Sequence, residues 1–236
     1  MADARAASID LRAHGRAQRR DRIVEAARRI IVRDGIDGLA MRGLAKEAGV
    51  AVRTLYNLFE GRDAILFEIT SRAMDRMDAA YDAEAPLDDP IARCHAVVVI
   101  SLRHVVEEEA WYRPVLLWRP EPGSRAAERS LATRAGRMQA VALEAAMARG
   151  DLRQECDPEA PGRLIYDGWE HAARLWAARH TDAEGFEARA LYALYVALLS
   201  VATDTHRDTF VARIRELEAR LANAARPGAR RTSSET

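Results

Sequence analysis

Apolar residues recur every three or four positions from about residue 19 to residue 223, and this spacing predicts helices along most of the chain. No stretch alternates apolar and polar residues in the manner of a half-buried strand, and no internal repeat is evident. Two segments rich in Pro, Gly and Asp, at 84–90 and 150–162, interrupt the helical pattern. The sequence therefore predicts an all-α protein.

The first third of the chain predicts four helices, at residues 19–34, 41–48, 52–59 and 62–82. Gly35 and Gly49 follow the first two, at positions where a left-handed backbone conformation ends a helix at little cost. We expect the first three helices to form a compact head, which the fourth links to a helical body. Residues 1–15 and 226–236 lack periodicity, and both are expected to be disordered tails.

The short helix at 52–59 has two chemically distinct sides when it is laid out at 100° per residue. The side expected to face inward carries Val52, Leu55 and Phe59. The opposite side carries Arg53, Thr54 and Asn57, with Tyr56 on the flank. Side chains of these types donate hydrogen bonds to phosphates and base edges in a DNA major groove. The pattern therefore predicts a surface that reads DNA.

Three sequence blocks carry a family resemblance: AKEAGV at 45–50, TLYNLF at 54–59 and RDAIL at 62–66. In this order and spacing they resemble the helix-turn-helix of the TetR family of bacterial transcriptional repressors, from about residue 18 to residue 69. One departure is that Leu39 and Ala40 stand where the family usually has Ser or Thr, and a lost N-cap typically costs about 1 kcal/mol.

The resemblance implies a DNA-binding domain at 17–76, with its motif at about 40–59, and a helical effector-binding and dimerisation domain at 84–225. It implies a cytoplasmic, ligand-responsive repressor that binds a palindromic operator in double-stranded DNA as a homodimer and is released by a small apolar or aromatic effector. The expected base-reading residues are Arg53, Thr54 and Asn57. The expected phosphate-binding residues are Arg42, Lys46, Tyr56 and Arg62.

The distribution of charge agrees with a DNA-binding head, although the formal net charge of the chain is zero. Residues 1–62 hold thirteen basic and eight acidic residues, so the remainder of the chain carries an acidic excess of five. A basic head on an acidic body attracts DNA at the motif and repels it elsewhere. Arg12, Arg16, Arg19 and Arg20 at the end of the N-terminal tail could form an arm on phosphates, with a solvated tail as the alternative.

The body carries an unusual aromatic load, because all four tryptophans lie there. Together these residues suit a pocket for a flat apolar or aromatic molecule, in which a histidine would orient the ligand. For any single residue, packing in the core is the alternative. The tentative effector-binding set is His104, Trp111, Trp118, Met138, Trp169, His171 and Trp176.

The helix expected at 186–203 is apolar over more than half of its circumference, and its predecessor at 163–180 carries small residues that allow close helix approach. We expect these two helices to form a mainly apolar dimer interface of more than roughly 2,000 Å² in total. The expected interface residues are Leu164, Ile165, Gly168, Ala172, Leu175, Leu191, Leu194, Tyr195, Leu198 and Leu199.

No motif of a nucleophile elbow, P-loop, zinc protease or dinucleotide site is present, so no catalytic residue, metal ligand or cofactor is expected. Cys94 and His95 are neighbours, but adjacent helical positions point about 100° apart and make a poor catalytic pair. Cys94 and Cys156 are expected to be free thiols in a reducing cytosol. No secretory signal or membrane-spanning stretch is visible.

Two alternatives stay open. One is a helical small-molecule-binding protein with a degenerate DNA head, and the other is an α-helical enzyme built on the aromatic pocket.

Overall fold

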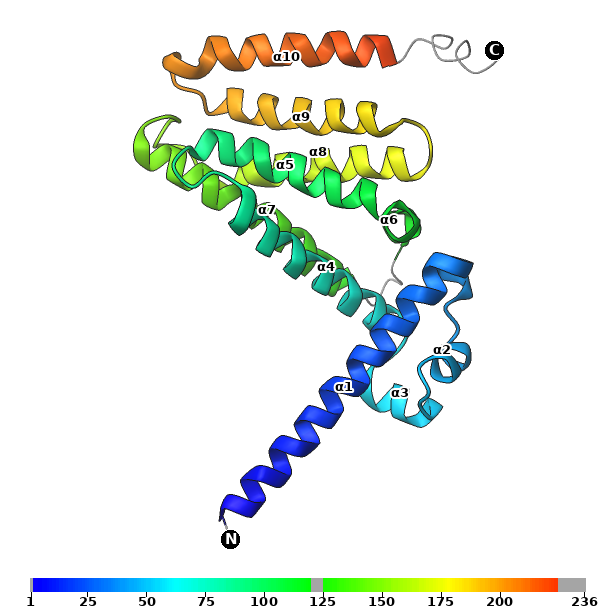
Figure 1. Ribbon diagram of the computed structural model, residues 1–236. Coiled ribbons are helices and arrows are strands. Elements are labelled where there is room, and N and C mark those ends of the chain that lie inside the picture. Colours follow the sequence, from blue (N-terminus) through cyan, green and yellow to red (C-terminus); the bar gives the residue numbers. More distant parts are fainter. Residues whose placement is uncertain (1, 120–124, 225–236) are drawn as a thin grey trace, which may run out of the picture. The chain divides into compact units, whose positions relative to one another are not determined.

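Helices make up almost all of the described chain (Figure 1). The computed structural model describes residues 2–119 and 125–224, with side chains for 14–119 and 133–223. In these ranges an isolated β-bridge pairs Leu152 with Ala202, and no strand is present, which confirms the all-α prediction. In chain order the elements are α1 (Ala2–Asp34), the 3-10 turn η1 (Ile36–Gly38), α2 (Met41–Glu47), α3 (Val52–Leu58), α4 (Arg62–Glu84), α5 (Pro90–Glu107), α6 (Glu109–Leu117), α7 (Arg125–Arg149), α8 (Glu159–Ala177), α9 (Ala183–Ser200) and α10 (Asp204–Ala224).

The chain folds as two compact units that share α4. Unit 1 runs from α1 to Ala73 and includes the segment that starts at Trp118, whereas unit 2 runs from Met74 to Leu117 and resumes at Arg129. The two domains were expected at 17–76 and 84–225, with the Pro-bounded segment 84–90 at the start of the second. That segment ends α4, but the boundary between the units lies within α4, because the two halves of one continuous helix pack on different cores.

The first helix is longer than expected. Residues 1–15 were predicted to be a disordered tail, but α1 begins at Ala2 and continues without interruption to Asp34. The segment is rich in Ala and Arg, which favour helix, and Gly15 is the one strong helix-destabilising residue within it. The other predicted tail, 226–236, lies outside the described residues.

The core of unit 1 is built from the apolar stripes that the sequence predicts. The buried side chains come from α1, α2, α3, the first half of α4 and the residues that directly follow η1 and α3. They include Ile23, Ala27, Ile30, Ile31, Leu39, Leu44, Ala45, Leu55, Phe59, Ile65, Leu66 and Ile69. Short helices such as α2 and α3 are marginal alone, so this shared core holds them in place.

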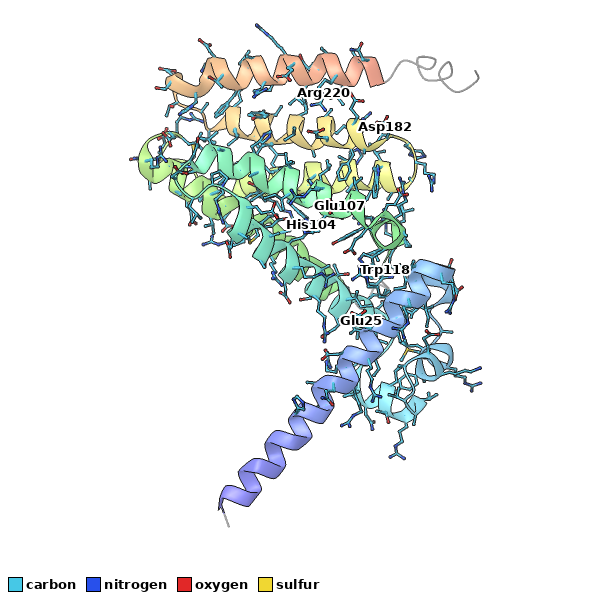
Figure 2. All side chains as sticks on the ribbon, viewed as in Figure 1. Glu25, His104, Glu107, Trp118, Asp182 and Arg220 are labelled. Atoms are coloured by element: carbon cyan, nitrogen blue, oxygen red, sulfur yellow. The ribbon has the colours of Figure 1, made fainter. Side chains whose placement is uncertain are left out.

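In unit 2, α9 is the central helix. It packs against α8, α10 and α5, and Figure 1 shows it between α8 and α10. A Cβ atom at Gly168 of α8 would lie only 2.2 Å from the Cβ of Ala193, so glycine is required where α8 and α9 approach each other. On the other side, Arg220 of α10 (labelled in Figure 2) pairs with Glu187 of α9 at 3.1 Å.

Helix α2 begins without a side-chain cap. Ala40 has the extended backbone of an N-cap residue, with φ −92° and ψ 136°, and its side chain can accept no hydrogen bond. We predict that Ala40→Ser stabilises unit 1 by about 0.5–2 kcal/mol. Slower hydrogen exchange across Met41–Glu47 would report the gain.

The matched control is Ala17→Ser, at an exposed position inside α1, which should lose a few tenths of a kcal/mol through helix propensity. Equal exchange in the wild type and Ala40→Ser would show that the first turn of α2 gains nothing from a hydroxyl.

Candidate nucleic-acid interface

The turn between α2 and α3 is a Schellman motif centred on Gly49. The Gly49 N–H donates to the Lys46 carbonyl at 3.2 Å, and the Val50 N–H donates to the Ala45 carbonyl at 3.0 Å. Gly49 has φ +64°, a conformation that L side chains rarely adopt. The predicted glycine turn is therefore present, and it sets the entry of the chain into α3.

Helix α3 buries one face and exposes the other. Leu55 is 0% exposed and Phe59, directly after the helix, is 4% exposed. Val52 was expected to face inward with them but is 38% exposed, because it lies in the first turn, at the edge of the core. The polar face agrees with the expectation: Arg53, Tyr56 and Asn57 are exposed and Thr54 is partly exposed.

The arginines of unit 1 fall into two sets that differ in their partners. The paired set bonds carboxylates within the unit: Arg20 and Arg72 with Glu68, Arg72 also with Asp21, and Arg29 and Arg33 with Glu47. In the unpaired set, no side chain makes a hydrogen bond or ion pair anywhere in the described structure: Arg16, Arg19, Arg22, Arg42, Lys46, Arg53 and Arg62. The four basic residues predicted to touch DNA from α2, α3 and the start of α4 all belong to the unpaired set. Arg20, predicted as part of an arm on phosphates, belongs to the paired set instead.

Arg20 fixes the far end of α3. One guanidinium nitrogen donates to the Leu58 carbonyl at 2.9 Å and another to Glu68 at 2.7 Å, while the group lies 4.4 Å from the centre of the Phe59 ring. Burial alone would raise the pKa of Glu68, but hydrogen bonds from Arg20 and Arg72 outweigh it and lower that pKa. These contacts join α1, α3 and α4, and they hold the exposed face of α3 in a fixed orientation.

The predicted effector-binding residues do not come together as one set. Trp118 belongs to unit 1, where it packs edge-on against Phe67 with ring centres 5.1 Å apart. Trp169 and Trp176 both pack on Phe186, each with ring centres 5.7 Å apart, and they are part of the α8–α9 core. His171 is exposed to solvent.

The other three members of that set lie in unit 2. Trp111 is buried in α6. His104 of α5 (labelled in Figure 2) places Nδ1 3.1 Å from the Ile100 carbonyl, one turn earlier in its own helix. Met138 of α7 packs on a cluster formed by Tyr81, Ala85, Val97 and Ile100. A single aromatic pocket lined by all seven residues stays a prediction, because seven-residue spacing puts two tryptophans on the same helix face but does not say what that face covers.

A residue that the sequence analysis missed is Gln139. It is 4% exposed, its Nε2 donates to the Cys94 carbonyl at 3.3 Å, and its Oε1 has no hydrogen-bond partner among the described residues. An unpartnered buried acceptor is costly unless a ligand or water satisfies it. The signal in the sequence was a glutamine at helical spacing within the apolar stripe of α7.

The predicted dimer residues are mostly buried inside the single chain. Ile165, Ala172, Leu191, Leu194, Tyr195 and Leu198 are at most 8% exposed, whereas Gly168, Leu175 and Leu199 are partly exposed and Leu164 is 48% exposed. The single chain does not expose these six residues to a partner, because α9 packs against α8, α10 and α5. Tyr195, for example, bonds His95 at 3.1 Å and packs on Phe210 of α10.

An exposed polar helix, presented by a glycine turn on a core of three further helices, defines a helix-turn-helix head of the DNA-binding type. Residues 23–69 match the family model described as bacterial regulatory proteins, tetR family. The head of the chain is therefore similar to the DNA-binding domain of this family of transcriptional regulators, and the homologues and structural neighbours of the chain are regulators rather than enzymes.

Curated relatives of the chain are transcriptional repressors. The chain is 26% identical over 178 residues to the HTH-type transcriptional repressor KstR of Rhodococcus jostii, covering 74% of this chain and 80% of that protein. It is 34% identical over 79 residues to the repressor KstR of Mycobacterium tuberculosis. That match covers 34% of this chain and only 36% of the relative.

Solved structures share the fold. Thermus thermophilus FadR, a TetR-family repressor crystallised with lauroyl-CoA, matches with a TM-score of 0.64 at 23% identity, covering 78% of this chain and 97% of that one. RolR in complex with resorcinol matches with a TM-score of 0.66 at 20% identity, covering 92% and 98%. In the described ranges no helix is long and apolar enough to cross a membrane.

The two sets of arginines predict opposite phenotypes. Arg20→Gln should destabilise unit 1 by about 1–2 kcal/mol, because it removes charge-assisted bonds to Leu58 and Glu68. Arg53→Gln should change stability by less than about 0.5 kcal/mol, because Arg53 has no partner to lose. Hydrogen exchange of the α3 amides separates the two outcomes.

The effect of Arg20→Gln should also depend on pH. Since Glu68 has a lowered pKa in the folded state, its contribution is present above its ordinary value of 4.5 and is lost as the pH falls through the lowered value. The gap between the wild type and Arg20→Gln should therefore narrow in acid. A gap that stays constant from pH 7 to pH 3 would contradict the assigned role of the Glu68 carboxylate.

Proposed function

We propose that this protein is a ligand-responsive repressor that binds a palindromic operator as a homodimer and is released by a small apolar or aromatic effector. The observation that carries the proposal is the division of charges in unit 1. Four basic side chains around the exposed face of α3 lack internal partners, while neighbouring arginines of α1 and α4 are neutralised by carboxylates. Unpaired cations beside an exposed helix suit a polyanion.

The residue types on α3 suggest how a duplex would be recognised. We assign base contacts in the major groove to Arg53, Thr54 and Asn57, since guanidinium pairs bidentately with guanine and a side-chain amide with adenine. We assign phosphate contacts to Arg42, Lys46, Tyr56 and Arg62, where they would fix the register of α3 without reading sequence.

We still propose a homodimer, but with an interface formed by exposed rather than buried residues of α8 and α9. On α8 and α9 the large apolar side chains that are most exposed are Leu164, at 48%, and Val196, at 37%. The close contact of Gly168 with Ala193 places the two helices against each other between these positions. We propose that this α8–α9 face pairs with its copy, so that two α3 helices meet half-sites about 34–36 Å apart or a multiple of that distance.

The effector would act in unit 2. We place it at Gln139, whose buried Oε1 lacks a hydrogen-bond partner among the described residues, so the molecule would be mainly apolar with one hydrogen-bond donor. Similar folds bind lauroyl-CoA in one case and resorcinol in another, and both ligands join an apolar part to polar groups. Because α4 belongs to both units, a shift at its second half can reach the head, and a coupling of about 1–3 kcal/mol would suffice.

Selection of duplexes from a random-sequence pool by the full-length protein tests this function. The expected result is a palindromic consensus bound roughly a thousandfold or more tightly than a scrambled duplex of equal composition. Equal affinity for both duplexes would contradict the proposed function as a transcriptional regulator. It would favour a small-molecule-binding protein whose head no longer reads DNA.

Substitutions on α3 should distinguish residues that contact bases from residues that contact phosphates. Asn57→Ala should relax preference at one or two positions of the selected consensus, at a cost of about 1–3 kcal/mol each. Tyr56→Phe should weaken consensus and scrambled duplexes by similar factors, because it removes a phosphate contact. If Asn57→Ala selects the same consensus with the same stringency, the polar face of α3 is assigned wrongly.

The corrected dimer face predicts that Leu164→Glu gives a folded monomer that no longer binds the palindrome tightly. Burying a carboxylate in an apolar interface costs several kcal/mol, whereas in the monomer this side chain is exposed to water. Sedimentation at micromolar concentration measures the state. Val141→Glu, at a 50% exposed position on α7, is the matched control and should remain dimeric.

If the wild-type protein sediments as a monomer and still binds the palindrome tightly, the proposal that it binds DNA as a homodimer is contradicted. Leu198→Glu is unsuitable for this test, because Leu198 is 0% exposed and its replacement would damage the core of the chain itself.

A further inference from the structure

Among the side chains of α1 that the structure describes, from residue 14 on, hydrogen bonds and ion pairs with the rest of unit 1 begin at Arg20 and Asp21. Residues 16–18 are exposed. Figure 1 shows the N-terminal half of the helix, in dark blue, extending past α2 and α3 of the same unit. Most helical stability in proteins comes from packing, so a binding partner would stabilise this exposed extension.

Its arginines form a stripe. Arg5, Arg12, Arg16 and Arg19 follow one another at spacings of seven, four and three residues. At 100° per residue these positions fall within an arc of about 60° on one face of α1. The acidic residues Asp3 and Asp10 occupy positions on another face. The extension is therefore basic along one side rather than uniformly charged.

The stripe continues the face of α1 that packs on the head. The next position in the series is Ile23, which is 0% exposed in the core of unit 1. The arginine positions therefore border the side of α1 on which α2, α3 and α4 lie. Arg16 and Arg19 make no hydrogen bond or ion pair in the described structure, so their charges are available.

The composition of the extension argues against a protein as its partner. Its large apolar residues are Ile9 and Leu11, which lie on roughly opposite sides of the helix and form no apolar stripe. A regular row of guanidinium groups instead fits the regular row of phosphates along a duplex, and arginine is well suited to bidentate contact with phosphate.

We infer that the N-terminal half of α1 is a second DNA-binding element, which lies along the phosphate backbone of the duplex that α3 reads. This rests on the proposed function, because α3 brings the duplex to unit 1. Residues 2–19 span about 27 Å as a helix. That length corresponds to roughly eight base pairs, so the arm lengthens the contacted backbone beyond the half-site.

The test is the salt dependence of binding to the duplex selected from the random pool, using full-length Arg16→Gln/Arg19→Gln. Glutamine keeps helix propensity close to that of arginine. Two lost phosphate contacts lower the slope of log K against log salt by about 1.8. Between 50 and 200 mM salt the variant should therefore lose about tenfold less affinity than the wild type, with the selected consensus unchanged.

The matched control is Arg179→Gln/Arg215→Gln, which removes two exposed and unpaired arginines of unit 2 and should keep the wild-type slope. If Arg16→Gln/Arg19→Gln has the same slope of log K against log salt as this control, the DNA-binding role of the N-terminal half of α1 is contradicted. Binding of the wild type to the consensus would still support the proposed function as a regulator. If the wild type binds no consensus duplex, the proposed function as a regulator is itself contradicted.

Two further outcomes also overturn the inference. A changed consensus in the stripe variant would assign the arm to base readout rather than to phosphates. Loss of binding to phosphatidylglycerol vesicles, with the wild-type DNA slope retained, would assign the stripe to a membrane surface.

Discussion

A single guanidinium ties together three helices of unit 1. Arg20 of α1 bonds the last carbonyl of α3 and the Glu68 carboxylate of α4, and it lies over the Phe59 ring. The recognition helix has only seven residues and no side-chain cap at its start, so its own hydrogen bonds cannot hold it. The orientation of its polar face therefore depends on this contact and on the buried Leu55.

The same residue type performs two tasks in this head, and its partners distinguish them. Carboxylates at Glu47 and Glu68 neutralise the arginines that hold the helices together. The arginines left without carboxylates lie on α2, on α3, at the start of α4 and on the N-terminal half of α1. A formal charge of zero over the whole chain hides this division, because what a polyanion meets is the local excess of unpaired cations.

The head could be predicted from sequence because its determinants are local: Gly49 at a turn, and Leu55 and Phe59 at helical spacing. The body could not, because its helices are apolar on several faces and periodicity does not say which neighbour covers which face. Leu194 and Leu198 suggested a surplus apolar face that a second chain would cover, but both are fully buried within the single chain, where α9 packs against α8, α10 and α5. Trp169 and Trp176 suggested a pocket, but both pack on Phe186 of the next helix, α9.

Hydrogen exchange of the full-length protein, with and without the duplex selected from a random pool, tests the central claim most directly. That claim is that α2 and α3 present the DNA-binding surface through the cations that the fold leaves unpaired. We predict that the duplex slows exchange across Met41–Leu58 and leaves the α8–α9 core unchanged. Slowed exchange confined to unit 2, with α2 and α3 exchanging as in the free protein, would contradict the account.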